Sequence, residues 1–170
     1  MISSAEPLAE TQLRALLGHT LSDLGLVPPL TPHDLCRSLG RQRVRDLELR
    51  ERDLPPGVAS GLLLSYANQD VIVYQRLTTP AHQAHIIFHE VVHLIRGHLD
   101  HNGGSVCEAL LAHRRDGRPG TLYGQWQEQE AETGATILSG WADAATASTP
   151  IADASTRRLG AALGCGVHWS

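Results

Sequence analysis

The sequence of 170 residues lacks several features that would each indicate a particular class of protein. No run of about 18 apolar residues is present, so we expect neither a transmembrane helix nor a membrane partner. The first 25 residues carry acids and lack both a basic start and an apolar segment, which predicts that there is no signal peptide. Three widely spaced cysteines (Cys36, Cys107 and Cys165) form no CxxC pair, a pattern typical of a reducing compartment. We therefore expect a cytoplasmic protein without a disulfide scaffold.

Lysine is absent as well, and all 14 basic residues are arginine. Because 18 acidic residues outnumber them, the net charge is −4, which argues against nucleic acid or an anionic membrane as a partner. The arginines between positions 41 and 52 are interleaved with acids, and this pattern predicts a solvated, salt-bridged strand instead of a nucleic-acid surface. Hydrophobic residues make up 42% of the chain, which is enough to build the core of one domain.

The spacing of apolar and turn residues predicts a single α+β domain over residues 1–170. A helical N-terminal part (1–42) comes first, followed by a part with strands and one long helix (43–98). The strands should form a small, mostly antiparallel meander, and they are expected at 44–49, 61–66 and 71–76. Helices should begin at capping residues and end near glycines. They are expected at 7–24, 31–40, 79–96, 105–113, 125–143 and, within the C-terminal tail (144–170), at 151–163.

Histidine is concentrated in one segment, with six of the ten histidines between positions 82 and 101. Residues 89–93 have the sequence His-Glu-Val-Val-His, which matches HExxH. On a helix, His89 and His93 lie one turn apart on the same side, so both imidazoles can bind one metal ion. Glu90 is rotated by about 100° and can hold a metal-bound water, whose pKa a zinc ion lowers toward about 7. The segment predicts one zinc ion per chain, with Glu90 as the general base.

Other interpretations of these residues remain open from the sequence. His85 and His89 also have i, i+4 spacing, but His85 and His93 lie about 12 Å apart along a helix and cannot share one ion. We favour His89 and His93, because the acid follows the first histidine of that pair. Catalytic zinc usually has a third protein ligand, which the acidic cluster at 128–132 can supply. Without a metal, the histidines would be partly buried polar residues and the cluster a solvated helix face.

The acidic cluster is expected on a helix, where successive residues advance by about 100°. Glu128 and Glu132 then share one face, while Glu130 points away and should be structural or solvent-facing. Ala131 and Ala135 lie on the face of Glu128 and Glu132, and their small side chains would let this helix approach the HExxH helix closely. If Glu128 binds the metal, Glu132 is suited to accept the second ring N–H of a ligating histidine. The reverse assignment of these two acids is the alternative.

Two segments together resemble a known family. HEVVHLIRGH (89–98) and EQEAETGATIL (128–138) are similar to the ImmA/IrrE family of cytosolic metallopeptidases. Members of that family have HExxH followed by a helix of the form E-x-E-A-[D/N]-x-x-A. The resemblance covers roughly residues 31–141. It implies a zincin-like fold, in which a small sheet packs against the HExxH helix and further helices.

The resemblance also implies roles for individual residues. Carried over position by position, it implies that Glu90 is the general base. It also implies that the zinc ligands are His89, His93 and Glu128. The chain departs from the family pattern at two places. Glu132 stands where the family has Asp or Asn, and Ser-Gly-Trp at 139–141 replaces the apolar-Pro ending that usually follows the acidic helix.

The expected function is zinc-dependent hydrolysis of a peptide bond in a cytoplasmic protein. The resemblance implies that this partner is a helix-turn-helix transcriptional regulator, because family members commonly act beside one. The substrate should lie extended along an edge of the sheet, most simply the strand at 71–76. The alternatives are a metal-binding sensor or partner-binding module with little proteolysis, and a small-molecule metallohydrolase. Four side chains are candidates for the donor that stabilises the oxyanion: Tyr123, His98, His101 and His113.

Overall fold

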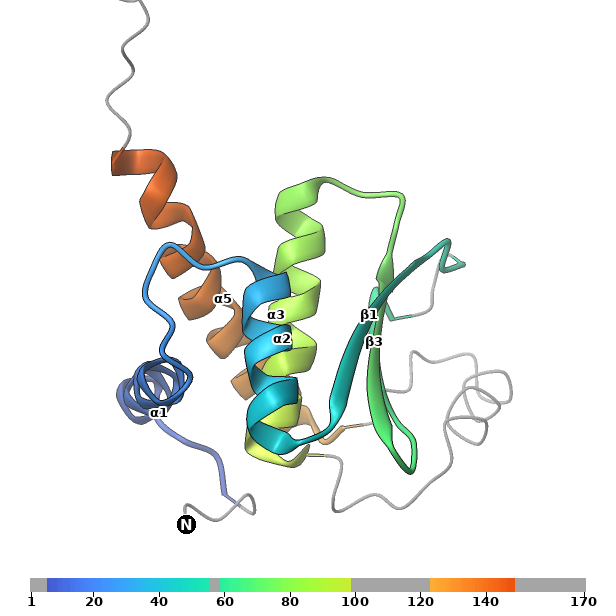
Figure 1. The fold of residues 1–170 in the computed structure, drawn as a ribbon, viewed down its shortest axis with the longest axis horizontal. Helices are drawn as coiled ribbons and strands as arrows, with labels where there is room; N and C mark the ends of the chain where they lie inside the picture. Colours follow the sequence, from blue (N-terminus) through green and yellow to red (C-terminus); the bar gives the residue numbers. More distant parts are fainter. Residues whose placement is uncertain (1–5, 56–58, 99–122, 149–170) are drawn as a thin grey trace, which may run out of the picture.

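The structure, a computed structural model, describes residues 6–55, 59–98 and 123–148. Among these residues the fold is α+β, with four helices and one three-stranded mixed sheet (Figure 1). No helix in the described ranges combines the length and the apolar character that crossing a bilayer requires. In chain order the elements are α1 (Glu10–Asp23), α2 (Pro32–Arg43), β1 (Asp46–Arg52), β2 (Gly61–Ser65), β3 (Gln69–Gln75), α3 (Pro80–Arg96) and α5 (Gln125–Ser148).

Helix α3 lies at the centre of the arrangement. It contacts β2 and β3 of the sheet and also packs along α5, while α2 contacts β1 and α1 contacts α5 (Figure 1). Phe88, Val91 and Val92 of α3 are fully buried, as is Ile72 of β3. Because apolar side chains on several sides of α3 are removed from water, burial holds this helix firmly between the sheet and α5.

The sheet corrects the sequence-based prediction of a mostly antiparallel meander. The strand order is β1-β3-β2, with β3 parallel to β1 and antiparallel to β2. β3 takes the central place because most of its residues are buried, whereas β1 alternates charged residues that remain exposed or half-buried. Continuous apolar strands favour the middle of a sheet, and charged strands favour its edges. The free edges among the described strands therefore belong to β1 and β2.

The boundaries of α3 confirm the helix predicted at 79–96. The Thr79 hydroxyl accepts a hydrogen bond from the backbone N–H of His82 (3.2 Å), and Pro80 occupies the first helical position. Gly97 ends the helix in the left-handed conformation (φ 65°), which glycine adopts without steric cost. Helix α2 continues past the predicted end at residue 40 and ends at Arg43. The helices predicted at 105–113 and 151–163 lie outside the described residues.

A buried carboxylate connects the end of α2 with the sheet. Asp70 is fully buried and accepts hydrogen bonds from Arg43 Nη1 (2.5 Å) and Ser65 Oγ (2.6 Å), while Arg45 Nε lies 3.0 Å away. Burial alone would raise the pKa of Asp70, but these hydrogen bonds outweigh burial and lower it. Two arginines of the arginine-rich segment thus pair with a buried acid outside it, whereas the exposed pair of Arg50 and Glu48 on β1 matches the predicted salt-bridged strand.

Small residues let α5 approach α3 closely. Ala131 and Ala135 are fully buried, which agrees with the predicted close approach on that face. Gly134 lies directly against α3, because a Cβ atom at this position would be 2.6 Å from Cγ2 of Val92. The separation of the two helices is therefore set at Gly134, where no room is left for a methyl group.

We expect Gly134→Ala to destabilise the protein by about 1–3 kcal/mol, because the added methyl group overpacks the contact with Val92. Gly140→Ala is the matched control, since it lies on the same helix and its Cβ would meet nothing within 4 Å. That control should stabilise the helix by about 0.5–1 kcal/mol. Denaturant unfolding measures both free energies, and equal effects of the two substitutions would contradict the packing account.

Candidate metal centre

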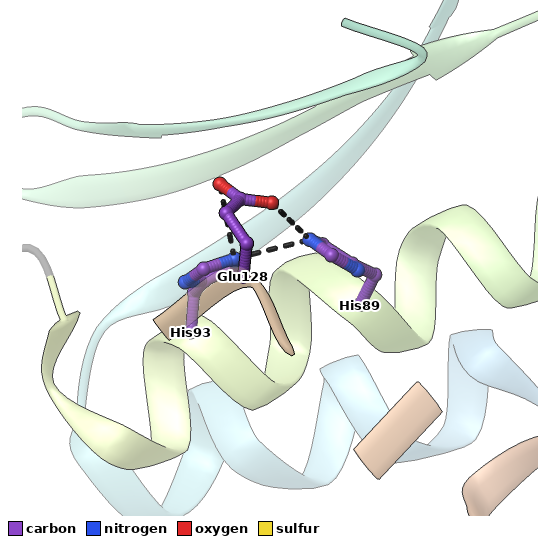
Figure 2. A group of neighbouring side chains, drawn as sticks. All are labelled: His89, His93 and Glu128. Carbon is purple, nitrogen blue, oxygen red and sulfur yellow. Dashed lines mark hydrogen bonds and ion pairs between the residues drawn. The ribbon is translucent and has the colours of Figure 1, made fainter. Parts of the chain in front are cut away.

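Three side chains from two helices converge on one point. His89 and His93 project from α3, and Glu128 reaches over them from the first turn of α5 (Figure 2). The Nε2 atoms of the two histidines are 3.1 Å apart. Oε2 of Glu128 lies 3.3 Å from Nε2 of His89, and Oε1 lies 4.0 Å from Nε2 of His93. One ligand atom from each residue falls within 4.8 Å of the others, so the group could hold a metal ion.

Local structure explains why these side chains meet. His89 and His93 are separated by one turn of α3 and therefore share a side of the helix. Glu128 lies in the first turn of α5, where the partial positive charge of a helix N-terminus favours a carboxylate. The close contact of α5 with α3 then places this carboxylate beside both imidazoles.

The two imidazoles have opposite electrostatic surroundings. His93 is fully buried, and burial together with the nearby charges of His89 and His98 lowers its pKa far below the ordinary value. Burial also opposes protonation of His89, but the hydrogen bond to Glu128 and the charge of Glu90 outweigh it and raise its pKa. His93 is therefore a neutral ring, which is the form that a metal ion requires.

Glu90 is buried between α3 and the edge strand β2. A Cβ atom at Gly61 of β2 would lie only 2.7 Å from Oε1 of Glu90, so the strand passes directly over the carboxylate. Burial raises the pKa of Glu90 to about 7, and the charge of Glu128 acts in the same direction. Within the described part of the chain, Oε2 of Glu90 has no hydrogen-bond partner. A buried carboxyl group with this pKa can both accept and release a proton near neutral pH.

A second acid of α5 lies beside the group without joining it. Oε2 of Glu132 is 3.5 Å from Nδ1 of His89, and Oε1 is 3.1 Å from Nε2 of His85. Nδ1 of His85 lies 3.4 Å from the hydroxyl of Ser139. His85 is thus occupied by Glu132 and Ser139, and the metal-binding group contains His93 in its place. Of the two histidine pairs that the sequence left open, the structure brings His89 and His93 together with Glu128.

The four candidates for an oxyanion donor have different positions. The ring of Tyr123 stacks on His93, with 3.5 Å between ring centroids and 14° between ring planes. His98 is fully buried, with Nδ1 2.8 Å from Nδ1 of His93 and Nε2 3.0 Å from Oε2 of Glu130. Because both of its ring nitrogens are engaged, we do not retain His98 as an oxyanion donor. Tyr123 stays a prediction for that role. The other two candidates, His101 and His113, lie outside the described residues.

The sequence did not reveal the network behind His93. Glu130 lies outside the metal-binding group and is buried, with Oε2 2.6 Å from Nε of Arg96 and 3.0 Å from Nε2 of His98. Its position agrees with a structural role and excludes a solvent-facing one. The signal that could have indicated the network is Gly97, since a left-handed residue after the last helical turn folds the next side chain back.

Comparison of this chain with known protein families, with curated proteins and with solved structures finds no match. The likeness to the ImmA/IrrE family therefore stays a prediction from two sequence segments. The geometry of the group itself does not depend on that likeness.

We expect one divalent metal ion per chain, bound by the three converging side chains. His93→Ala removes a buried ligand and should abolish stoichiometric binding after dialysis against zinc, as measured by metal analysis. His85→Ala is the matched control on the same helix, because His85 contacts Glu132 outside the group and its loss should leave the stoichiometry at one. Loss of metal in His85→Ala together with retention in His93→Ala would reverse the ligand assignment.

Proposed function

We propose that this protein is a zinc-dependent metallopeptidase. The observation that carries the proposal is the combination of a two-histidine, one-carboxylate group with a buried glutamate whose pKa lies near 7. Metal-binding groups that serve structure alone have no need of a proton acceptor at this position. The combination is suited to hydrolysis of a carbonyl compound by an activated water molecule.

The donor set supports zinc as the metal. Zinc binds imidazole nitrogen and carboxylate oxygen at about 2.0–2.2 Å in tetrahedral geometry, which places neighbouring ligand atoms about 3.3–3.6 Å apart. The 3.1 Å between the two Nε2 atoms and the 3.3 Å from Nε2 of His89 to Oε2 of Glu128 lie close to that value. The 4.0 Å from Nε2 of His93 is measured to the other carboxylate oxygen, Oε1. Three protein ligands would leave one position for water or substrate, as is usual at catalytic zinc sites. A bound zinc ion would polarise the scissile carbonyl and acidify that water.

Glu90 supplies the proton transfers in this proposal. Its buried carboxylate accepts a proton from the attacking water and then donates this proton to the departing amine. Both transfers are favoured when the pKa of the group lies near the working pH, and burial raises the pKa of Glu90 to about 7. The unpartnered Oε2 atom provides a free acceptor for the water.

The substrate is proposed to lie along β2, not along the strand at 71–76 that the sequence suggested. That segment belongs largely to β3, which has a neighbour on both sides. One backbone hydrogen bond to β3 lies just beyond each end of β2. Gln75 N–H donates to the Ser60 carbonyl (2.9 Å), and Tyr66 N–H donates to the Gln69 carbonyl (2.8 Å). Even-numbered residues of this strand therefore face β3. The N–H and C=O groups that face the free edge belong to Gly61, Leu63 and Ser65.

The free edge of β2 passes beside the proposed base. The backbone N–H of Leu63 is a hydrogen-bond donor to Glu90, one of the influences that lower the pKa of this carboxyl group. An extended peptide that pairs with the remaining edge groups of β2 would thus bring a backbone carbonyl close to Glu90 and to the metal-binding group. Recognition through backbone groups favours a peptide or an unfolded protein segment as substrate over a small molecule.

The particular protein substrate rests on the resemblance alone. It suggests a helix-turn-helix transcriptional regulator in the cytoplasm, inactivated by cleavage. The competing proposal is a sensor or partner-binding module that binds zinc and cleaves little. Glu90 argues against it, because a site that only binds zinc needs no proton acceptor, and burying this carboxyl group costs stability.

We expect Glu90→Gln to retain zinc and to lose peptide hydrolysis by about 10²–10⁴-fold, because glutamine keeps the size of the side chain but cannot accept a proton. The assay is digestion of a peptide library by the zinc-loaded protein, with new peptide ends counted by mass spectrometry. Glu10→Gln is the control, since Glu10 is an exposed carboxylate paired with Arg14 on α1.

Undiminished hydrolysis by zinc-loaded Glu90→Gln would refute the proposed mechanism. Wild-type protein that binds zinc but cleaves no library peptide would favour the binding module. Cleavage confined to small non-peptide compounds would favour the metallohydrolase.

A further inference from the structure

We propose that β1 is a dimerisation edge, at which two copies of this chain pair their β1 strands antiparallel about a two-fold axis at Leu49. The proposal goes beyond the proposed function and does not depend on the metal-binding group. It is carried by a free strand edge, by an open groove beside that edge and by a sequence of charges that complements itself.

The free edge of β1 carries backbone groups that point away from the sheet. The N–H of Arg76 donates to the carbonyl of Arg52 (2.9 Å), so the even-numbered residues of β1 direct their backbone groups toward β3. The N–H and C=O groups of Leu47, Leu49 and Glu51 therefore face the free edge. A row of such groups is a template on which another strand can pair.

The space beside this edge is open. In Figure 1, β1 lies in front of β3, and no described helix or strand lies in front of β1. A groove of about 920 Å³ runs beside the first half of the strand, and its lining includes Gly40 of α2 together with Leu47 and Leu49 of β1. Because this groove is empty, α2 leaves space for a second strand beside β1.

The charges of β1 select a second copy of the same strand as the occupant. Its even-numbered side chains share one face of the sheet and are, in order, Asp46, Glu48, Arg50 and Arg52. In an antiparallel pair centred on Leu49, residues at equal distances before and after the centre face each other. Glu48 then faces Arg50 of the second copy, and Asp46 faces Arg52 of the second copy. The two-fold axis repeats both pairs, so every cross-strand pair on this face joins opposite charges, which stabilises antiparallel pairing.

The same register satisfies the backbone. Leu49 directs its N–H and C=O to the free edge, so it can form a hydrogen-bonded pair with Leu49 of the second copy, and Leu47 can do so with Glu51. The charged residues then occupy the other positions, where opposite side chains lie closest. Pairs centred one residue away, on Glu48 or on Arg50, would place like charges directly opposite each other. The register centred on Leu49 is therefore favoured by backbone and charge together.

The charged side chains at the centre are available for this exchange. Arg50 donates to both carboxylate oxygens of Glu48 (2.8 Å and 2.6 Å), and the two side chains are 41% and 45% exposed. Each can thus contact the second copy without leaving a buried position. Pairing at β1 gives one continuous sheet with the strand order β2-β3-β1-β1-β3-β2. The edge of β2, along which the substrate is proposed to lie, stays free in both copies.

The test is the mass of the 170-residue chain in solution, measured by sedimentation velocity over a concentration series. With rising concentration, the mass of the wild type should increase from 18.4 kDa toward twice that value. Arg50→Glu and Glu48→Arg each place like charges opposite each other on both sides of the axis. Either substitution should raise the dissociation constant of the dimer by more than about tenfold.

Charge exchange separates mispairing from damage to the fold. An equal mixture of the Arg50→Glu and Glu48→Arg chains again has opposite charges at both positions, so the mixture should form heterodimers. The double variant Glu48→Arg/Arg50→Glu should dimerise like the wild type. Arg14→Glu is the matched control, since it also reverses an exposed arginine paired with an acid, Glu10 on α1 (3.1 Å), and it should leave dimerisation unchanged.

A wild type that stays at 18.4 kDa throughout the series would overturn the proposal and leave the edge without a second copy as its partner. A dimer that neither single reversal weakens would also overturn it, because such a dimer uses another surface. Dimerisation that is lost in the single variants and recovered neither in their mixture nor in the double variant would contradict the proposed pairing. None of these measurements involves metal or cleavage, so they are independent of the peptidase proposal.

Discussion

The contact between α3 and α5 is the constraint on which the candidate site depends. Two of its side chains come from α3 and one from α5, so the group exists only while the helices stay at their present separation. Gly134 against Val92 sets that separation, and the buried Ala131 and Ala135 extend the contact. The ion pair in which Arg96 Nε donates to Glu130 joins the same two helices. Apolar packing and the ion pair therefore both hold α3 and α5 together.

The site has a buried side and an exposed side, and each suits a different task. His93, Glu90 and the network behind them are removed from water, which fixes orientation and raises the pKa of the proposed base. Glu132 is largely exposed and His89 partly so, and the proposed function assigns this side to water and substrate. A hydrolytic site needs both properties, because its proton acceptor must be tuned while its substrate must enter.

Local features of the structure could be predicted from the sequence, whereas features that depend on distant pairing could not. The bounds of α3 follow from Thr79, Pro80 and Gly97, which act within one turn of the helix. The HExxH spacing likewise brings two histidines to one side of a helix, whatever surrounds it. Strand pairing is different, because an alternating pattern shows that a strand exists but not which neighbour it has. The central place of β3 depends on burial on both faces of the assembled sheet.

The candidate site shows the same division. Helical periodicity placed Glu128 and Glu130 on different sides of the helix, and in the structure Glu128 belongs to the metal-binding group whereas Glu130 does not. The contact of His98 with His93 depends on the turn at Gly97 and on a partner that lies 32 residues further along the chain. No helical or strand period connects such positions. The network became visible only with the helices in place.

The most direct test of the central claim is a crystal structure of zinc-loaded protein with anomalous scattering data at the zinc edge. One peak is predicted, within about 2.0–2.2 Å of Nε2 of His89, Nε2 of His93 and a carboxylate oxygen of Glu128. The fourth coordination position of the zinc ion should be open to water. A peak bound by His85 or Glu130, or a zinc-loaded protein with no peak at this group, would contradict the account.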